Sequence, residues 1–254
     1  MHTETICRIA EELHCSGLRP GGTVLVHSSL SSMGHVPGGP ETVISGLLKA
    51  LGPEGTLLLP ALSFAHVNAS QPVFNVRETP SNIGKIPEYF RTRPGTIRSI
   101  HPTHSVCGVG VRAAELLGEH HLDQTPGGEH SPYRLLKDCG GQILFLGCGL
   151  RPNTSMHAVE EIVEPPYLFG ELETYRAMLV DGSEMEIKCR RHDFEGYHQR
   201  YDRIAALVDP YELMAGKVLS ADVRLLECKS MWEKGVAAME KDPFFFVEKQ
   251  EPND

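Results

Sequence analysis

The sequence predicts an α/β fold with a mainly parallel central sheet that is covered by helices and carries a small antiparallel addition in its C-terminal third. Two strand-like runs, 23–27 and 56–62, flank an amphipathic stretch over 40–50. This order of strand, loop, helix and strand is typical of parallel sheets. Both runs are almost continuously apolar, as expected for strands buried on both faces. The antiparallel addition is indicated by Asp181-Gly182, a hairpin-turn dipeptide between two further strand-like runs.

The chain opens on a predicted helix over 3–16, because Ile6, Ile9, Ala10 and Leu13 recur at helical spacing. Apolar periodicity and capping residues predict the remaining helices. They cover 40–50, 83–93 with Ser81 or Asn82 as cap, 111–117, 133–137, a segment capped by Asn153, Thr154 or Ser155, and stretches near 197–207 and 222–240. The expected strands are 23–27, 56–62, 105–110, 142–146, and a hairpin of 173–180 with 184–188. The polar stretch 63–80 is expected to be irregular.

Length and composition favour one domain over 1–254, with the antiparallel lobe at about 171–190. No apolar run is long enough to span a membrane, and the first residues do not resemble a signal peptide. The seven cysteines form no CxxC pair, which favours reduced thiols in a cytoplasm. A net charge of −9 speaks against nucleic acid as the main partner and suits a small cationic substrate.

The most informative motif follows the predicted strand 142–146. Glycines and a proline turn the chain there, and a predicted helix then carries His157 and Glu160. Residues three apart share one face of a helix. An imidazole held by a carboxylate is a candidate general base near neutral pH, and strand ends in such folds open into ligand crevices. The alternative interpretation is an ordinary surface pair.

A loop rich in serine and glycine, 27–39, joins a predicted strand to a predicted helix. Free backbone N–H groups beside a helix N-terminus bind phosphate in other proteins. The loop contains neither GK[ST] nor GxGxxG, so neither nucleotide motif applies. The alternative is a plain connection made of turn residues.

Two further stretches carry ionisable side chains. His101, His104 and Cys107 suggest a metal site by their residue types, but a strand sends residues three apart to opposite faces. We therefore expect no metal there, and predict a polar rim to a pocket. The segment 190–193 has the charges to bind an anion, or it is a solvated charge run.

Taken in order, these stretches resemble the aminoglycoside 3-N-acetyltransferase family, from about residue 3 to about residue 240. The matching pieces are VHSSL at 26–30 with GGPETV at 38–43, GTLLLP at 55–60, RSIHP at 98–102 with Ser105 and GVG at 108–110, GEHSP at 128–132, and LGCG at 146–149 with NTSMHAVE at 153–160. The resemblance implies the antibiotic N-acetyltransferase fold and direct transfer of an acetyl group from acetyl-CoA, as cosubstrate, to an amine of an aminoglycoside.

The resemblance also implies roles for individual residues. The CoA pyrophosphate and pantetheine would bind at Ser31, Ser32, Met33 and Val36, and the acyl arm would lie along Ser105, Val106 and Cys107. His157 would take the proton from the amine, and Glu160 would orient His157. An amine near pH 7 is mostly protonated, so it needs such a base before it attacks a thioester.

The chain departs from the drug-modifying members after Glu161, where its next segment is short. Three alternatives follow. The enzyme would use a non-aminoglycoside amine, or would be a metal-dependent deacylase built on His101, His104 and His157, or the fold would bind ligand without turnover. The expected partner is a small amine, with a homodimer through the C-terminal helices left open.

Overall fold

The computed structural model describes residues 2–250, and its centre is a seven-stranded sheet in the order β10-β11-β6-β1-β2-β5-β4. The three central strands run parallel, and each outer strand is antiparallel to its inner neighbour. The central strands are β6 (Gln142–Leu146), β1 (Thr23–Ser28) and β2 (Thr56–Pro60). The outer strands are β10 (Leu213–Val218), β11 (Ala221–Glu227), β5 (Val106–Gly110) and β4 (Ile97–Arg98).

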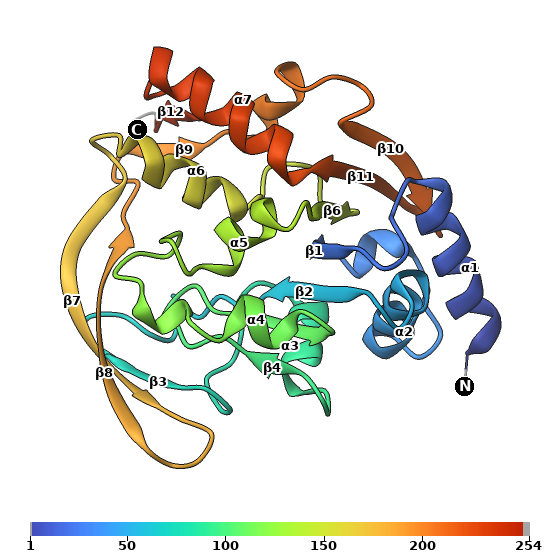
Figure 1. Ribbon diagram of the computed structural model, residues 1–254, viewed down its shortest axis with the longest axis horizontal. Helices are drawn as coiled ribbons and strands as arrows, with labels where there is room; N and C mark the ends of the chain where they lie inside the picture. The colour runs from blue at the N-terminus through green and yellow to red at the C-terminus, as the bar shows by residue number, and fades with distance from the viewer. Residues whose placement is uncertain (1, 251–254) are drawn as a thin grey trace.

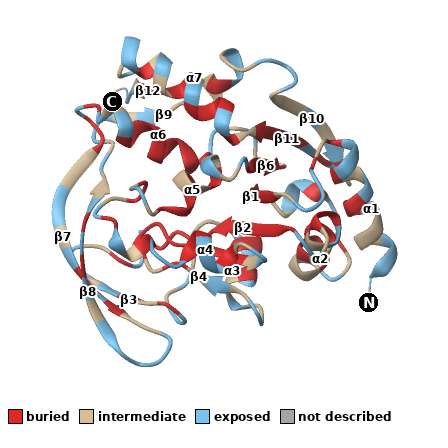
Figure 2. Cartoon of the chain, viewed as in Figure 1, coloured by how far each residue is buried: buried red, intermediate tan, exposed pale blue. Residues whose placement is uncertain are grey.

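Helices cover both faces of this sheet (Figure 1). Successive side chains of β1 point to opposite faces, so Val24 and Val26 join one hydrophobic cluster and Leu25 joins the other. The first cluster lies against α1 (Thr3–Cys15), α2 (Pro40–Leu51) and α3 (Lys85–Thr92). The second lies against α4 (Ala113–Leu117), α5 (Pro132–Asp138), α6 (Ser155–Val163) and α7 (Cys228–Lys241). Figure 2 shows the resulting burial of the central strands.

A smaller sheet in the order β3-β7-β8 forms the curved edge of the molecule (Figure 1). The long strands β7 (Phe169–Met178) and β8 (Glu184–His192) pair antiparallel, and β3 (Val73–Asn75) adds in parallel to β7. Two short strands, β9 (Tyr197–Gln199) and β12 (Val247–Lys249), pair separately. The 3₁₀ helices are η1 (Ser31–Met33), η2 (His120–Leu122) and η3 (Tyr201–Ala206).

The predicted fold class and the hairpin are confirmed, while several element boundaries were wrong. The region 197–207 contains β9 and η3 in place of an α-helix. The predicted helix 222–240 begins as β11, and its helical part starts only at Cys228. Val223 and Leu225 are buried opposite Leu146 and Leu144 of β6, so pairing with a buried sheet edge overrides the local helical pattern.

Two smaller predictions also fail. The stretch 63–80 contains the short strand β3, because β7 offers it an unpaired edge. The third helix begins at Lys85 with Gly84 at the N-cap, so neither Ser81 nor Asn82 caps it.

Within residues 2–250, no helix is both long enough and apolar enough to cross a bilayer.

The strand order creates one favoured place for a ligand. From β1 the chain passes through α2 to β2 on one side, whereas β6 lies on the other side of β1. The direction of the connections therefore reverses between β1 and β6. In open α/β sheets, ligands bind in the crevice beyond the carboxyl ends of the strands at such a reversal.

Candidate active site

A cavity of about 590 Å³ opens beyond the carboxyl ends of β1, β2 and β6. Its walls come from segments that are far apart in the sequence. They include His27 and Ser28 at the end of β1, Cys148 and the turn after β6, His157 on α6, and the end of β8. The cavity thus lies at the reversal point between β1 and β6, where the topology favours a ligand.

His157 stands in the first turns of α6 and lines this cavity, with 9% of its side chain exposed. Nδ1 of its ring lies 2.9 Å from the hydroxyl of Tyr201 and 3.6 Å from Oε2 of Glu160. Because these groups engage Nδ1, Nε2 of the ring is left for the cavity. An imidazole anchored in this way has a defined orientation and one nitrogen available for proton transfer.

Glu160 is fully buried and is held by two tyrosines. Tyr201 donates to Oε2 at 2.7 Å, and Tyr167 donates to Oε1 at 3.1 Å. A buried carboxylate needs such donors, since its water is lost on folding. The predicted pair of His157 and Glu160 is therefore brought together, with Tyr201 between the two side chains.

Two further histidines face His157. The ring centroids of His104 and His192 lie 5.5 Å and 4.8 Å from that of His157. Nδ1 of His104 contacts the hydroxyl of Thr103 at 2.8 Å, and Nε2 of His192 contacts Oε1 of Glu161 at 2.7 Å. In each of these two rings, one nitrogen is therefore engaged by a neighbouring side chain, and the second nitrogen takes no part in that contact.

Burial controls the charge of these groups. Burial, followed by repulsion from the neighbouring imidazoles, lowers the pKa of His104 and of His192 well below the ordinary value. Burial also lowers the pKa of His27, which lines the same cavity, to about 3. Desolvation raises the pKa of Glu161 to about 7, against the opposing hydrogen bonds from Thr125 and Gly127. His27, His104 and His192 are thus neutral imidazoles at neutral pH.

The segment proposed for CoA lies between β1 and α2. Ser31 and Ser32 are exposed in η1, and Ser32 donates to the carbonyl of Gly147 at 2.8 Å. Met33 and Val36 are buried beneath them. These positions do not line the 590 Å³ cavity, but Ser32 lines a neighbouring hollow of about 550 Å³ together with Arg224.

The second proposed CoA segment is buried. Ser105, Val106 and Cys107 each have no exposed surface, and the Ser105 hydroxyl donates to the carbonyl of Ala61 at 2.9 Å. Arg98 donates to the same hydroxyl. None of the three residues lines the 590 Å³ cavity, and their contact with an acyl arm stays a prediction.

His101 takes no part in the imidazole group that faces the cavity. Its Nδ1 accepts the backbone N–H of His104 at 3.0 Å, and its ring stacks on His120 with centroids 4.7 Å apart. The metal-compatible group within residues 2–250 is instead His104, His157 and His192. Sequence spacing pointed to His101 because it cannot show which way the turn at 101–104 faces.

Sequence reasoning missed Tyr201 and Tyr167, and treated His192 only as part of a charged run. Tyr201 precedes Asp202 in η3, and no local pattern links it to α6. A buried tyrosine has the same sequence appearance whether it packs in a core or orients a carboxylate. The contact of Tyr201 with His157 and Glu160 becomes visible only in the tertiary structure, where the chain brings η3 next to α6.

Comparison with known proteins identifies the family. A family model described as aminoglycoside 3-N-acetyltransferase matches residues 25–240. Aminoglycoside N(3)-acetyltransferase VII of Streptomyces paromomycinus is 32% identical over 269 residues, covering 93% of this chain and 92% of that protein. A mutant of aminoglycoside acetyltransferase AAC(3)-IVa in complex with a gentamicin has a TM-score of 0.80 at 26% identity, covering 94% of this chain and 90% of the other. AAC-IIIb, solved as a binary complex with CoASH, has a TM-score of 0.79 at 26% identity and 97% coverage of both chains. This chain therefore belongs to the aminoglycoside 3-N-acetyltransferase family, as its motifs predicted.

Proposed function

We propose that this protein is an acetyl-CoA-dependent N-acetyltransferase that acetylates an amine of an aminoglycoside by direct attack, with His157 as general base and Glu160 as the carboxylate that positions it. One observation carries the proposal. Nδ1 of His157 is anchored by Tyr201 and Glu160, which leaves Nε2 for a cavity at the strand reversal.

Nε2 of His157 would accept a proton from the substrate ammonium, because only the free amine carries a lone pair for attack. The amine nitrogen then bonds to the thioester carbonyl carbon, and the carbon–sulfur bond breaks. The proton held by His157 passes to the departing CoA thiolate, so the imidazole returns to its neutral form. The acylated nitrogen loses its second ammonium proton to solvent, so the products are a neutral amide, the CoA thiol and one free proton. Glu160 offsets the transient positive charge on the ring through Tyr201.

Acetyl-CoA is the proposed cosubstrate because the family acetylates and one structural relative was solved with CoASH. The residues near η1 fit part of that ligand. Ser31 and Ser32 present exposed hydroxyls, and Arg224 lines the hollow beside them, although Asp202 and Asp222 line it too. Hydroxyls and a guanidinium are suitable groups for a pyrophosphate.

The aminoglycoside substrate class is supported by the named relatives, of which one was solved with a gentamicin. The net charge of −9 is consistent with a polycationic substrate. A simpler amine is the alternative acceptor, since the segment after Glu161 is short.

The test is a thiol-release assay with acetyl-CoA and a panel of aminoglycosides and simple amines. We expect His157→Ala to lower kcat by about 10²–10⁴-fold, the usual contribution of a general base. CoA affinity, measured by calorimetry, should change little. The matched control is His198→Ala, which removes an exposed histidine of β9.

Retained turnover in His157→Ala would refute its role as base. Parallel loss of turnover and CoA affinity would show instead that His157 supports the fold of the site. If simple amines are acetylated and aminoglycosides are not, the proposed acetyltransferase activity stands, and its acceptor is a simple amine.

A further inference from the structure

Three histidines from separate parts of the chain line the cavity. His104 precedes β5, His157 belongs to α6 and His192 ends β8. Each offers one nitrogen, and these three atoms lie within 4.8 Å of one another. We propose that this trio, the His104–His157–His192 site, binds one Zn²⁺ ion that blocks acetyl transfer by occupying the nitrogen His157 needs as a base.

Each of the three rings already has one nitrogen engaged by a group outside the trio. Nδ1 of His104 contacts the Thr103 hydroxyl at 2.8 Å, and Nε2 of His192 contacts Oε1 of Glu161 at 2.7 Å. Nδ1 of His157 contacts the Tyr201 hydroxyl at 2.9 Å. Histidines that bind metals almost always have their second ring nitrogen held in this way, which fixes the tautomer and aims the other lone pair at the ion.

Nδ1 of His192 is buried and has no hydrogen-bond partner within the described chain. Its other nitrogen contacts Glu161, and when that side chain is an ionised carboxylate it accepts the N–H of His192, so Nδ1 carries a free lone pair. Only 2% of the His192 side chain is exposed, and a buried acceptor without a partner is costly. A cation coordinated by Nδ1 would satisfy it.

A divalent cation in a buried site needs negative charge nearby, and two buried acidic side chains lie next to rings of the trio. Glu161 contacts His192, and Oε2 of Glu160 lies 3.6 Å from Nδ1 of His157. These carboxylates would not coordinate the ion themselves. They would raise the basicity of the imidazoles that do.

Imidazole ligands favour Zn²⁺ over Mg²⁺ or Ca²⁺, which prefer oxygen ligands. Zinc–nitrogen bonds of about 2.0–2.1 Å in a tetrahedron place the nitrogens about 3.4 Å apart. The trio therefore has to contract from its present spacing of up to 4.8 Å when the ion binds. Three protein ligands leave the fourth position open to the cavity.

The inhibitory consequence rests on the proposed function of His157. A nitrogen lone pair that coordinates zinc cannot also accept a proton from the amine. Zinc at this site would thus compete with the first step of acetyl transfer, without denaturing the protein or displacing the groups near η1.

The binding test uses the full-length protein treated with a chelator and then titrated with Zn²⁺ by calorimetry. We expect one ion per chain. His104→Ala and His192→Ala should each weaken binding at least tenfold, and Glu161→Gln, which removes the charge behind His192, by about 10–100-fold. His27→Gln is the matched control, since His27 lines the same cavity outside the trio.

Cobalt(II) provides a second readout that does not depend on activity. Substituted protein should show the visible absorption of a tetrahedral nitrogen site, and this spectrum should disappear in His192→Ala. Thiolate-to-cobalt bands would overturn the proposal, because they would assign the ion to cysteines. Zinc affinity that is equal in the wild type and in both histidine variants would overturn it too.

Activity separates this inference from the proposed function. Zinc should inhibit thiol release by the wild type, a chelator should restore it, and His192→Ala should be at least tenfold less sensitive. Stimulation by zinc would overturn the inhibitory role. If no amine is acetylated but zinc still binds the trio, the proposed function fails while the metal site stands.

Discussion

The Tyr201 hydroxyl donates a 2.7 Å hydrogen bond to Oε2 of Glu160. The same hydroxyl lies 2.9 Å from Nδ1 of His157, whereas the direct distance from that nitrogen to the carboxylate is 3.6 Å. The carboxylate thus reaches the imidazole chiefly through a tyrosine. Tyr201 is a positioning residue in this arrangement, because its hydroxyl contacts both the ring of His157 and the carboxylate of Glu160.

Removing this hydroxyl should slow turnover. We expect Tyr201→Phe to lower kcat about tenfold, with a smaller change in KM, since the ring of His157 loses its principal anchor. The acidic limb of the pH–rate profile should shift, a change that a purely structural defect would not produce. Tyr167→Phe is the control, because the Tyr167 hydroxyl donates to the other oxygen of Glu160 and to the carbonyl of Pro243, without a hydrogen bond to His157. Equal losses in both variants would contradict the role assigned to Tyr201.

Direct transfer predicts that the enzyme forms no acetylated cysteine. Burial raises the pKa of Cys148, which lines the cavity, to about 11, and raises the pKa of Cys107 to about 12. Thiolate, the nucleophilic form, is therefore scarce at neutral pH. Protein mixed with acetyl-CoA without amine should show no added acetyl mass and no burst of CoA release. A stoichiometric acetyl adduct would demonstrate a covalent intermediate.

Gly147 couples the turn after β6 to the η1 segment. Its φ is +74°, and a Cβ added there would lie 2.6 Å from Cβ of Ser32. Gly149 has a φ of +64° but open space around it. We expect Gly149→Ala to lower the free energy of unfolding by about 1 kcal/mol through backbone strain. Gly147→Ala should lower it by about 1–3 kcal/mol more, because of the steric clash.

Denaturant unfolding measures both effects, and calorimetry with CoA measures the local one. Gly147→Ala should weaken CoA binding more than Gly149→Ala, since only the first displaces Ser32. Equal free energies of unfolding of the two variants would show that the η1 segment moves to accommodate the added methyl group without loss of stability.

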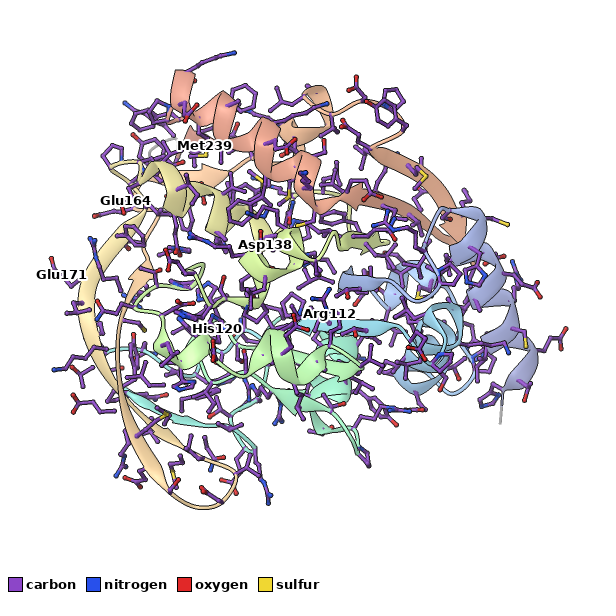
Figure 3. All side chains as sticks on the ribbon, viewed as in Figure 1. Arg112, His120, Asp138, Glu164, Glu171 and Met239 are labelled. Atoms are coloured by element: carbon purple, nitrogen blue, oxygen red, sulfur yellow. The ribbon has the colours of Figure 1, made fainter. Side chains whose placement is uncertain are left out.

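His120 predicts a loss of stability in mild acid. This side chain, which is labelled in Figure 3, belongs to η2. It is fully buried, and its ring contacts the Ser99 hydroxyl and the carbonyl of Pro126. Burial lowers its pKa from 6.5 to about 3. The unfolded chain therefore binds the extra proton between these values, so stability falls as pH decreases below 6.5. The expected contribution at pH 5 is about 2 kcal/mol.

The measurement is the free energy of unfolding of wild type and His120→Gln between about pH 5 and pH 7.5, the range in which an unfolded histidine titrates. The variant is expected to be less stable at the upper end of this range, yet to lose less stability than the wild type on acidification. Parallel pH dependences would show that His120 does not titrate on unfolding. Other buried histidines contribute to the total slope, so the difference between the two proteins is the informative quantity.

The sequence by itself determined the fold class, the family and the pairing of His157 with Glu160. These features depend on local patterns. Apolar runs define the buried strands β1, β2 and β6, and spacing along α6 places the two side chains on one face. The turn at Asp181-Gly182 was equally visible, because its geometry depends on the two turn residues themselves.

The tertiary structure alone decided which distant residues complete the site. Tyr201 and His192 approach α6 only because η3 and the end of β8 return to the same cavity. The strand β11 likewise depends on the free edge of β6, which overrides a helical pattern at 222–227. Contacts between distant segments depend on the path of the whole chain, and local sequence patterns carry no information about that path.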